Sequence, residues 1–188
     1  MRIESACLGA LATNCYLIEK DSRRLLIDPG DSGPALDALI AERKIDWVIN
    51  THGHFDHVGG SWSLPGVPVA MHRGDLDYAE QAVPGHPPVD RYLEDGDEII
   101  PGFVVLHVPG HSLGSIALLA DGVLVVGDLL FAGSIGRTDF PGGSPNDMRR
   151  SLQRIVALPG DYRVLPGHGE ETTLDRERRN NPFLLHLV

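Results

Sequence analysis

The stretch NTHGHFDHVGG, residues 50–60, places four metal-binding side chains within six positions. His52, His54, Asp56 and His57 come directly after the apolar run WVI. Side chains two positions apart in an extended chain point to the same side, so His52 and His54 can serve one ion. Asp56 and His57 lie one step further into the turn and can face a second ion. Burying so many ionisable groups without a metal would be costly, so the stretch indicates a metal-binding loop.

Three more metal-type residues each come within a few positions of the end of an apolar run: His111, Asp128 and His168. Loops at the ends of rigid strands are where binding sites are commonly built. Four such runs therefore predict that the ligands converge at one edge of the fold. A single Zn²⁺ binds about four ligands, so seven ligand residues are too many for one ion. They suit two ions a few ångströms apart that share one carboxylate and one water.

Short apolar runs that end in Gly, Pro, Asp or Asn predict eight strands. They cover residues 14–20, 23–31, 45–51, 67–72, 103–110, 116–120, 123–128 and 162–168. Amphipathic spacing and proline in the first turn predict helices, and a third short helix should stop before Pro182. The first two cover residues 32–44 and 144–160, the latter with a Ser144 cap, and the third lies within residues 174–184. Strands interleaved with helices predict an α/β fold of sheets covered by helices.

Two segments stand out by their glycine and proline content, the Gly59-Gly60 pair and residues 81–98. Gly59 and Gly60 are expected to let a helix start close against the metal loop, because glycine permits close backbone approach. Residues 81–98 are rich in proline and glycine and are expected to form a connection rather than a core element.

The chain has 188 residues, and we expect one domain that spans residues 1–188. Its net charge of −10, without a Lys/Arg cluster, argues against a nucleic-acid partner. No apolar run approaches about 18 residues and no signal-peptide pattern begins the chain, so we expect no membrane partner and a cytoplasmic location. Cys7 and Cys15 are expected to be small core residues rather than a disulfide framework. The oligomeric state stays open.

Isolated residues carry weaker signals. The other histidines are expected at the surface or in the core, with His107 as a possible support for a ligand: His72, His86, His107 and His186. Asp28 is either a turn-forming residue or a support for a metal ligand. Arg137 either makes a surface salt bridge or contacts the substrate.

The motifs THGHFDHVGG, PGHSLGS, GDLLF and LPGHG, in this order, resemble those of the metallo-β-lactamase superfamily. Within it, SIGRTDFPGGS and ERRNNPFL are similar to the short bacterial glyoxalase II-like (hydroxyacylglutathione hydrolase-like) proteins. The resemblance covers nearly the whole chain and implies a four-layer αβ/βα sandwich with the metals at one edge of the paired sheets. It implies one ion on His52, His54 and His111, a second on Asp56, His57 and His168, and a bridging Asp128.

Differences between this sequence and other subgroups of the superfamily limit the subgroups that it resembles. His54 stands where flavodiiron members carry Glu, and Asp128 stands where the β-lactamases proper usually lack the bridging carboxylate. The nuclease members are expected to bind RNA or DNA, which the negative charge disfavours. Only 20 residues follow His168 (188 − 168), so we expect the C-terminal helical domain of full-length glyoxalase II to be absent. That domain helps to bind glutathione, so the identity of the thiol stays open.

The resemblance implies a dinuclear hydrolase that cleaves a small thioester of the S-hydroxyacylglutathione type by attack of a metal-bound hydroxide. Zinc is the expected metal, and iron and manganese suit the same donors. Asp56 and Asp128 are the expected catalytic residues. Arg137, nine positions after Asp128 on a Gly-rich loop, is expected to bind a substrate carboxylate. The alternative is a mononuclear-iron persulfide dioxygenase, a class with a stretch similar to GRTDF that holds its iron with two His and one Asp.

Overall fold

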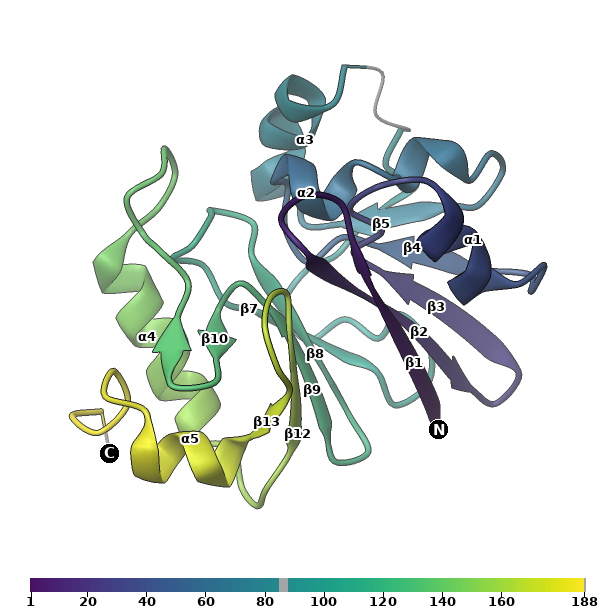
Figure 1. Cartoon of the computed structure of the whole chain (residues 1–188). Coiled ribbons are helices and arrows are strands. Elements are labelled where there is room, and N and C mark those ends of the chain that lie inside the picture. Colours follow the sequence, from purple (N-terminus) through teal and green to yellow (C-terminus); the bar gives the residue numbers. More distant parts are fainter. Residues whose placement is uncertain (85–87, 188) are drawn as a thin grey trace. The chain divides into compact units, whose positions relative to one another are not determined.

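The computed structural model describes residues 1–84 and 88–187 (Figure 1). Contacts along the chain divide it into two compact units, Met1–Leu93 and Glu94–Val188, and each is described by itself. Each unit is a β-sheet with helices packed on it, so the mixed α/β class is confirmed. Within the described ranges no helix is long and apolar enough to cross a bilayer. The single domain over residues 1–188 stays a prediction.

The first unit contains a six-stranded sheet in sequential order. Its strands are β1 Arg2–Leu8, β2 Thr13–Lys20, β3 Arg23–Ile27, β4 Trp47–Ile49, β5 Val69–Met71 and β6 Arg91–Tyr92. β1, β2 and β3 pair antiparallel, whereas β3, β4, β5 and β6 pair parallel. Parallel strands end at the same edge of a sheet. The loops that follow β3, β4 and β5 therefore begin side by side.

The helices of the first unit are short. They are α1 Pro34–Ile40, α2 Phe55–Val58, α3 Leu76–Ala82 and the 3₁₀ turns η1 Ser61–Ser63 and η2 Arg73–Asp75. Leu36 and Leu39 of α1 pack with Leu17, Leu26 and Val48 of the sheet in one apolar cluster. The helix expected over residues 32–44 is thus present but shorter. It ends because Ala41 and the residue after it have left-handed backbone angles.

The glycine pair after the metal loop has a different role from the one expected. α2 ends before Gly59, and only the single turn η1 begins after Gly60. A Cβ at Gly59 would lie 2.4 Å from the carbonyl oxygen of Gly30, and one at Gly60 would lie 2.6 Å from that of Asp31. The pair therefore lets the loop after β3 pass directly against the metal loop.

The expected connection at residues 81–98 is partly structured. It contains the end of α3 and the strand β6, and Leu93 is fully buried, so the expectation that this stretch lies outside the core is wrong for these residues. Residues 85–87 of the stretch, which include His86, lie outside the described part of the chain.

The two cysteines are free thiols, as expected. Cys15 is buried in β2, and burial raises its pKa well above the ordinary value. Cys7 is exposed, which corrects its placement in the core. It lies on β1, the first strand in the order of the sheet.

The second unit contains a five-stranded sheet in the order β13-β12-β9-β8-β7 and a two-stranded β10-β11 hairpin. The strands are β7 Val104–His107, β8 Ile116–Ala120, β9 Val123–Gly127, β10 Leu130–Phe131, β11 Ser134–Ile135, β12 Arg163–Pro166 and β13 Thr172–Thr173. β7 and β9 both run antiparallel to β8, and β12 runs parallel to β9. The ends of β7, β9 and β12 therefore lie at one edge of this sheet.

Two helices complete the second unit, α4 Pro145–Val156 and α5 Leu174–Asn180. Ser144 caps α4 as predicted, because its hydroxyl oxygen accepts a hydrogen bond from the backbone N–H of Asp147 at 3.2 Å. Met148, Leu152 and Ile155 of α4 pack in the apolar cluster of this sheet. α5 ends before Pro182, as predicted.

Candidate metal centre

The first unit brings together the four ligand-type residues of the opening stretch. Ligand atoms lie within 4.8 Å of one another for His52 with His54, for His52 with His57, and for Asp56 with His57. Nε2 of His57 is 3.6 Å from Oδ2 of Asp56. His52 and His57 are buried, whereas His54 and Asp56 are partly exposed. The crowding predicted from the sequence is therefore present.

Asp28 supports this cluster. It lies directly after β3, is buried, and accepts hydrogen bonds from the backbone N–H and the hydroxyl of Thr51, both at 2.7 Å. Its Oδ2 also lies 2.8 Å from Nδ1 of His57. The Thr51 hydroxyl donates to Asp28, so it accepts from Nδ1 of His52 at 3.1 Å. These contacts assign the Nδ1 protons and direct Nε2 of His52 and His57 at the site.

Asp28 thus fits the ligand-support alternative for this residue. It also has a left-handed backbone angle, with φ of 49°, so it turns the chain as well. The sequence left both roles open for Asp28, a turn residue after a strand and a support for a metal ligand. Thr51, its partner, was not singled out.

A second buried carboxylate holds the backbone between the first two histidines. Oδ2 of Asp75 accepts a hydrogen bond from the N–H of Gly53 at 2.9 Å. A Cβ on Gly53 would lie 2.5 Å from the carbonyl oxygen of Asp75 and 3.0 Å from Cβ of Tyr78. The Tyr78 ring packs edge-on against the His54 ring at 5.5 Å. Burial, and then the nearby Asp75, raise the pKa of Tyr78. None of these residues was singled out in the sequence.

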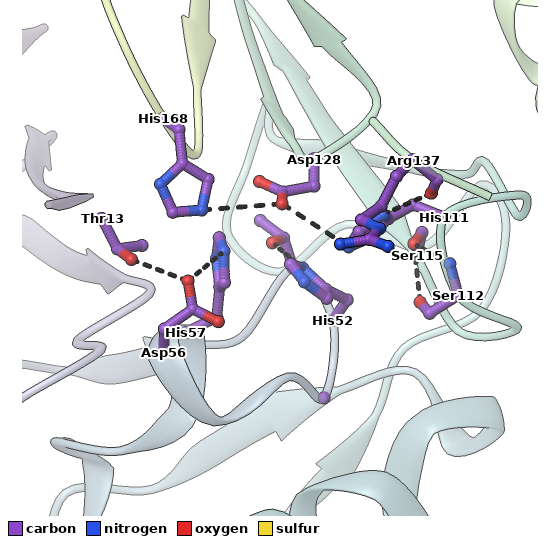
Figure 2. Close-up of polar contacts among 12 residues, drawn as sticks. Thr13, His52, Asp56, His57, His111, Ser112, Ser115, Asp128, Arg137 and His168 are labelled. Atoms are coloured by element: carbon purple, nitrogen blue, oxygen red, sulfur yellow. Dashed lines mark hydrogen bonds and ion pairs between the residues drawn. The ribbon is translucent and has the colours of Figure 1, made fainter. Parts of the chain in front are cut away.

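Thr13 makes a further contact that sequence reasoning missed. Its hydroxyl donates to Oδ2 of Asp56 at 2.9 Å (Figure 2). Thr13 is fully buried at the start of β2, 43 positions away in the chain. Only the pairing of β2 in the sheet brings this hydroxyl to the metal loop.

The second unit brings its three ligand-type residues to one carboxylate. Nε2 of His111 lies 3.5 Å and Nε2 of His168 lies 3.6 Å from the same oxygen, Oδ2 of Asp128 (Figure 2). Ligand atoms about 2.1 Å from a tetrahedral ion are about 3.4 Å apart. The spacing suits a carboxylate oxygen that shares an ion with each of the two histidines. This spacing is compatible with the bridging role that the resemblance implies for Asp128, which stays a prediction.

The loop after the β10-β11 hairpin orients His111. Nδ1 of His111 lies 2.8 Å from the carbonyl oxygen of Arg137, so the ring donates there and directs Nε2 at Asp128. A Cβ on Gly136 would lie 1.7 Å from the carbonyl oxygen of Asp128 and 3.3 Å from Nδ1 of His111. Only glycine fits at this position.

The side chain of Arg137 is paired on the surface. Its guanidinium donates two hydrogen bonds to Asp139, both at 2.7 Å, and lies 4.0 Å from the centre of the Phe140 ring. This pairing lowers the pKa of Asp139 to about 2. The geometry is that of the surface salt bridge considered for Arg137, and its role in binding substrate stays a prediction.

The lone histidines have other partners or lie at the surface. Nδ1 of His72 accepts the N–H of Gly74 and caps η2. Nε2 of His107 lies 2.9 Å from the carbonyl oxygen of Leu113. His186 is exposed.

Comparison with known proteins gives the family. Residues 8–168 match the model of the metallo-beta-lactamase superfamily. Hydroxyacylglutathione hydrolase GloC of Haemophilus influenzae is 34% identical over 98% of each chain. The structure of TTHA1623 in a di-iron-bound form is 42% identical, with a TM-score of 0.90 over 96% of this chain and 100% of that one. ETHE1 from Myxococcus xanthus is 27% identical, with a TM-score of 0.80 over 100% and 89% of the two chains.

The chain belongs to the metallo-beta-lactamase superfamily, and within it to the metallo-hydrolases. The metallo-β-lactamase type of α/β fold expected from the sequence is the fold of these relatives and is confirmed. The donor set also fits divalent metals, since imidazole nitrogen and carboxylate oxygen suit zinc, iron and manganese. The hydrogen bonds that Nδ1 of His52, His57 and His111 donates are of the kind that orient metal-bound histidines.

Proposed function

We propose that the protein is a dinuclear metal-dependent hydrolase that cleaves a small thioester of the S-hydroxyacylglutathione type. The observation that carries the proposal is the position of Asp128, one oxygen of which faces both His111 and His168. A bridging carboxylate is expected of a two-metal hydrolase. The 34% identity to hydroxyacylglutathione hydrolase GloC over nearly all of both chains supports the thioester substrate.

We propose the ligand sets that the family resemblance implies. One ion takes His52, His54 and His111, the second takes Asp56, His57 and His168, and Asp128 bridges them. Divalent ions bound there would polarise the thioester carbonyl and activate water at neutral pH. Zinc is the proposed metal, and the di-iron form of TTHA1623 makes iron the first alternative to test.

The chain's own residues hold the imidazoles in one orientation. Asp28 accepts a hydrogen bond from Nδ1–H of His57, and the Thr51 hydroxyl accepts one from Nδ1–H of His52. The carbonyl oxygen of Arg137 accepts one from Nδ1–H of His111. Each ring thus keeps Nε2 for a metal without reorganising during turnover. The leaving thiolate needs no strong acid, because a thiol has a pKa of about 8.5. Hydrolysis of a thioester is therefore compatible with a site that consists of His and Asp.

The test is a panel of thioesters, with S-D-lactoylglutathione included, run on protein of measured metal content. We expect about two ions per chain and thiol release that disappears when a chelator removes them and returns when Zn²⁺ is restored. A chain that holds two ions and cleaves no thioester in the panel would contradict the proposed substrate class.

The similarity to ETHE1 supports a second candidate, a mononuclear-iron persulfide dioxygenase. That chemistry needs one iron and consumes oxygen. Metal counting and oxygen uptake with glutathione persulfide separate the two candidates. One iron per chain, with oxygen uptake and no thioester cleavage, would favour the dioxygenase.

A further inference from the structure

The C-terminal helix α5 carries a buried carboxylate and a buried amide that face the β10-β11 hairpin. Glu177 and Asn181 are 1% and 0% exposed. Oε2 of Glu177 accepts hydrogen bonds from the N–H of Gly133 at 2.8 Å and from Nδ2 of Asn181 at 2.9 Å, and Oε1 accepts from the hydroxyl of Thr172 at 2.6 Å. A buried carboxylate is costly, and these three donors offset the cost.

Asn181 completes the contact with the hairpin. Its Nδ2 donates to the carbonyl oxygen of Ser134 at 3.0 Å and lies 3.3 Å from that of Phe131. The Glu177–Asn181 pair thus binds three backbone groups at the turn of the hairpin. The hairpin has only two residue pairs, and a hairpin so short is not stable by itself. Side chains from α5 therefore fix its position.

The hairpin and the residues that flank it adjoin each ligand-type residue of the second unit. Asp128 lies two positions before β10. Arg137, whose carbonyl oxygen accepts from His111, lies two positions after β11. The ring of Phe131 packs edge-on against the His168 ring at 6.2 Å.

We propose that Glu177 and Asn181 are positioning residues that set the metal affinity of the second unit by holding this hairpin. The inference rests on the proposed metal centre. Both residues are assigned a role through the hairpin that they hold, and Glu177 also binds the hydroxyl of Thr172 in β13. A glutamine at 177 would present one oxygen where the glutamate presents two, so one of the present donors would face an NH₂ group.

The experiment measures Zn²⁺ affinity of the full chain by competition with a chromophoric chelator, together with thermal unfolding. We expect Glu177→Gln and Asn181→Ala each to weaken Zn²⁺ binding about 10- to 100-fold, the usual effect of removing an outer support of a ligand. If Glu177→Gln fails to fold, Asn181→Ala decides the matter.

The matched control is Arg178→Gln on the same helix. Arg178 donates to three backbone carbonyls at and just after the end of α4, those of Val156, Leu158 and Gly160, and these three residues lie outside the hairpin. We expect this variant to unfold at a lower temperature and to keep its Zn²⁺ affinity.

The outcomes separate this inference from the proposed function. Wild-type affinity in both Glu177→Gln and Asn181→Ala would overturn the positioning role while the wild-type protein still binds two ions. An equal loss of Zn²⁺ affinity in Arg178→Gln would show that general destabilisation explains the loss, and it would overturn the positioning role as well. A wild-type chain that binds no Zn²⁺, Fe²⁺ or Mn²⁺ would overturn the proposed function and this inference with it.

Discussion

The two sets of ligand-type residues are built in opposite ways. The first unit takes four of them from six consecutive positions after β4, so one loop sets their spacing. The second unit takes one residue from each of three loops, between positions 111 and 168, that follow separate strands. Local chain geometry governs the first set, whereas the second depends on strand pairing and on a hairpin fixed from α5. Damage to strand pairing or to the hairpin should therefore change the spacing of the second set more than that of the first.

The largest expected effect is that of Asp128→Asn. The change removes a negative charge from an oxygen that faces both His111 and His168. We expect loss of metal from both sites and a fall in turnover of about 100-fold or more, since bridging charge is needed between two cations. Metal analysis and thioester turnover check this. Full activity with two bound ions would show that Asp128 does not bridge.

The next prediction compares the loss of one ligand-type residue from each set. His57→Ala in the first unit and His168→Ala in the second should each lose thioester hydrolysis by a similar large factor if both serve one ion. Metal stoichiometry and steady-state kinetics measure the two side by side. Retention of one iron and of oxygen uptake in both variants would point to the mononuclear alternative, in which these residues matter less.

A support residue should have a smaller effect than a ligand. Asp28→Asn replaces an acceptor of the His57 ring proton with a group that cannot accept from all of the present donors. We expect metal affinity to fall about 10- to 100-fold. Asp90→Asn is the control, because Asp90 accepts a hydrogen bond from the N–H of Val69 at 2.8 Å and the amide oxygen of Asn can keep it. Equal metal affinity in Asp28→Asn and Asp90→Asn would show that Asp28 does not support the metal centre.

The smallest expected effect is that of Arg137→Ala. If its guanidinium binds a substrate carboxylate, the variant should raise KM for S-D-lactoylglutathione with a smaller change in kcat, and the difference should shrink at high salt. The pKa of Asp139 is about 2, so the Arg137–Asp139 pair stays ionised above that pH and is lost only as the pH falls toward it. The KM ratio should therefore be constant across neutral pH. Unchanged kinetics in a folded, metal-bound variant would leave Arg137 as a surface ion pair.

Parts of the fold could be predicted because their causes are local. The cap at Ser144, the apolar face of α4 and the stop before Pro182 depend on neighbouring residues, and all three are present. The eight predicted strands also contain strands of the structure. β1, β6, β13, the β10-β11 hairpin and α3 were missed, since short or mixed segments gain their structure from pairing and packing.

The sequence by itself determined the types of ligand residue and the loop at residues 52–57. Residues that are within six positions of one another along the chain cannot lie far apart in space. Tertiary structure alone decided which residues orient them. Thr13, Asp28 and Asp75 reach the metal loop from distant elements, and Glu177 reaches the hairpin across 44 positions. A hydrogen bond depends on distance and angle in space. Spacing along the chain therefore carries no signal for such contacts until strand pairing and helix packing have fixed the fold.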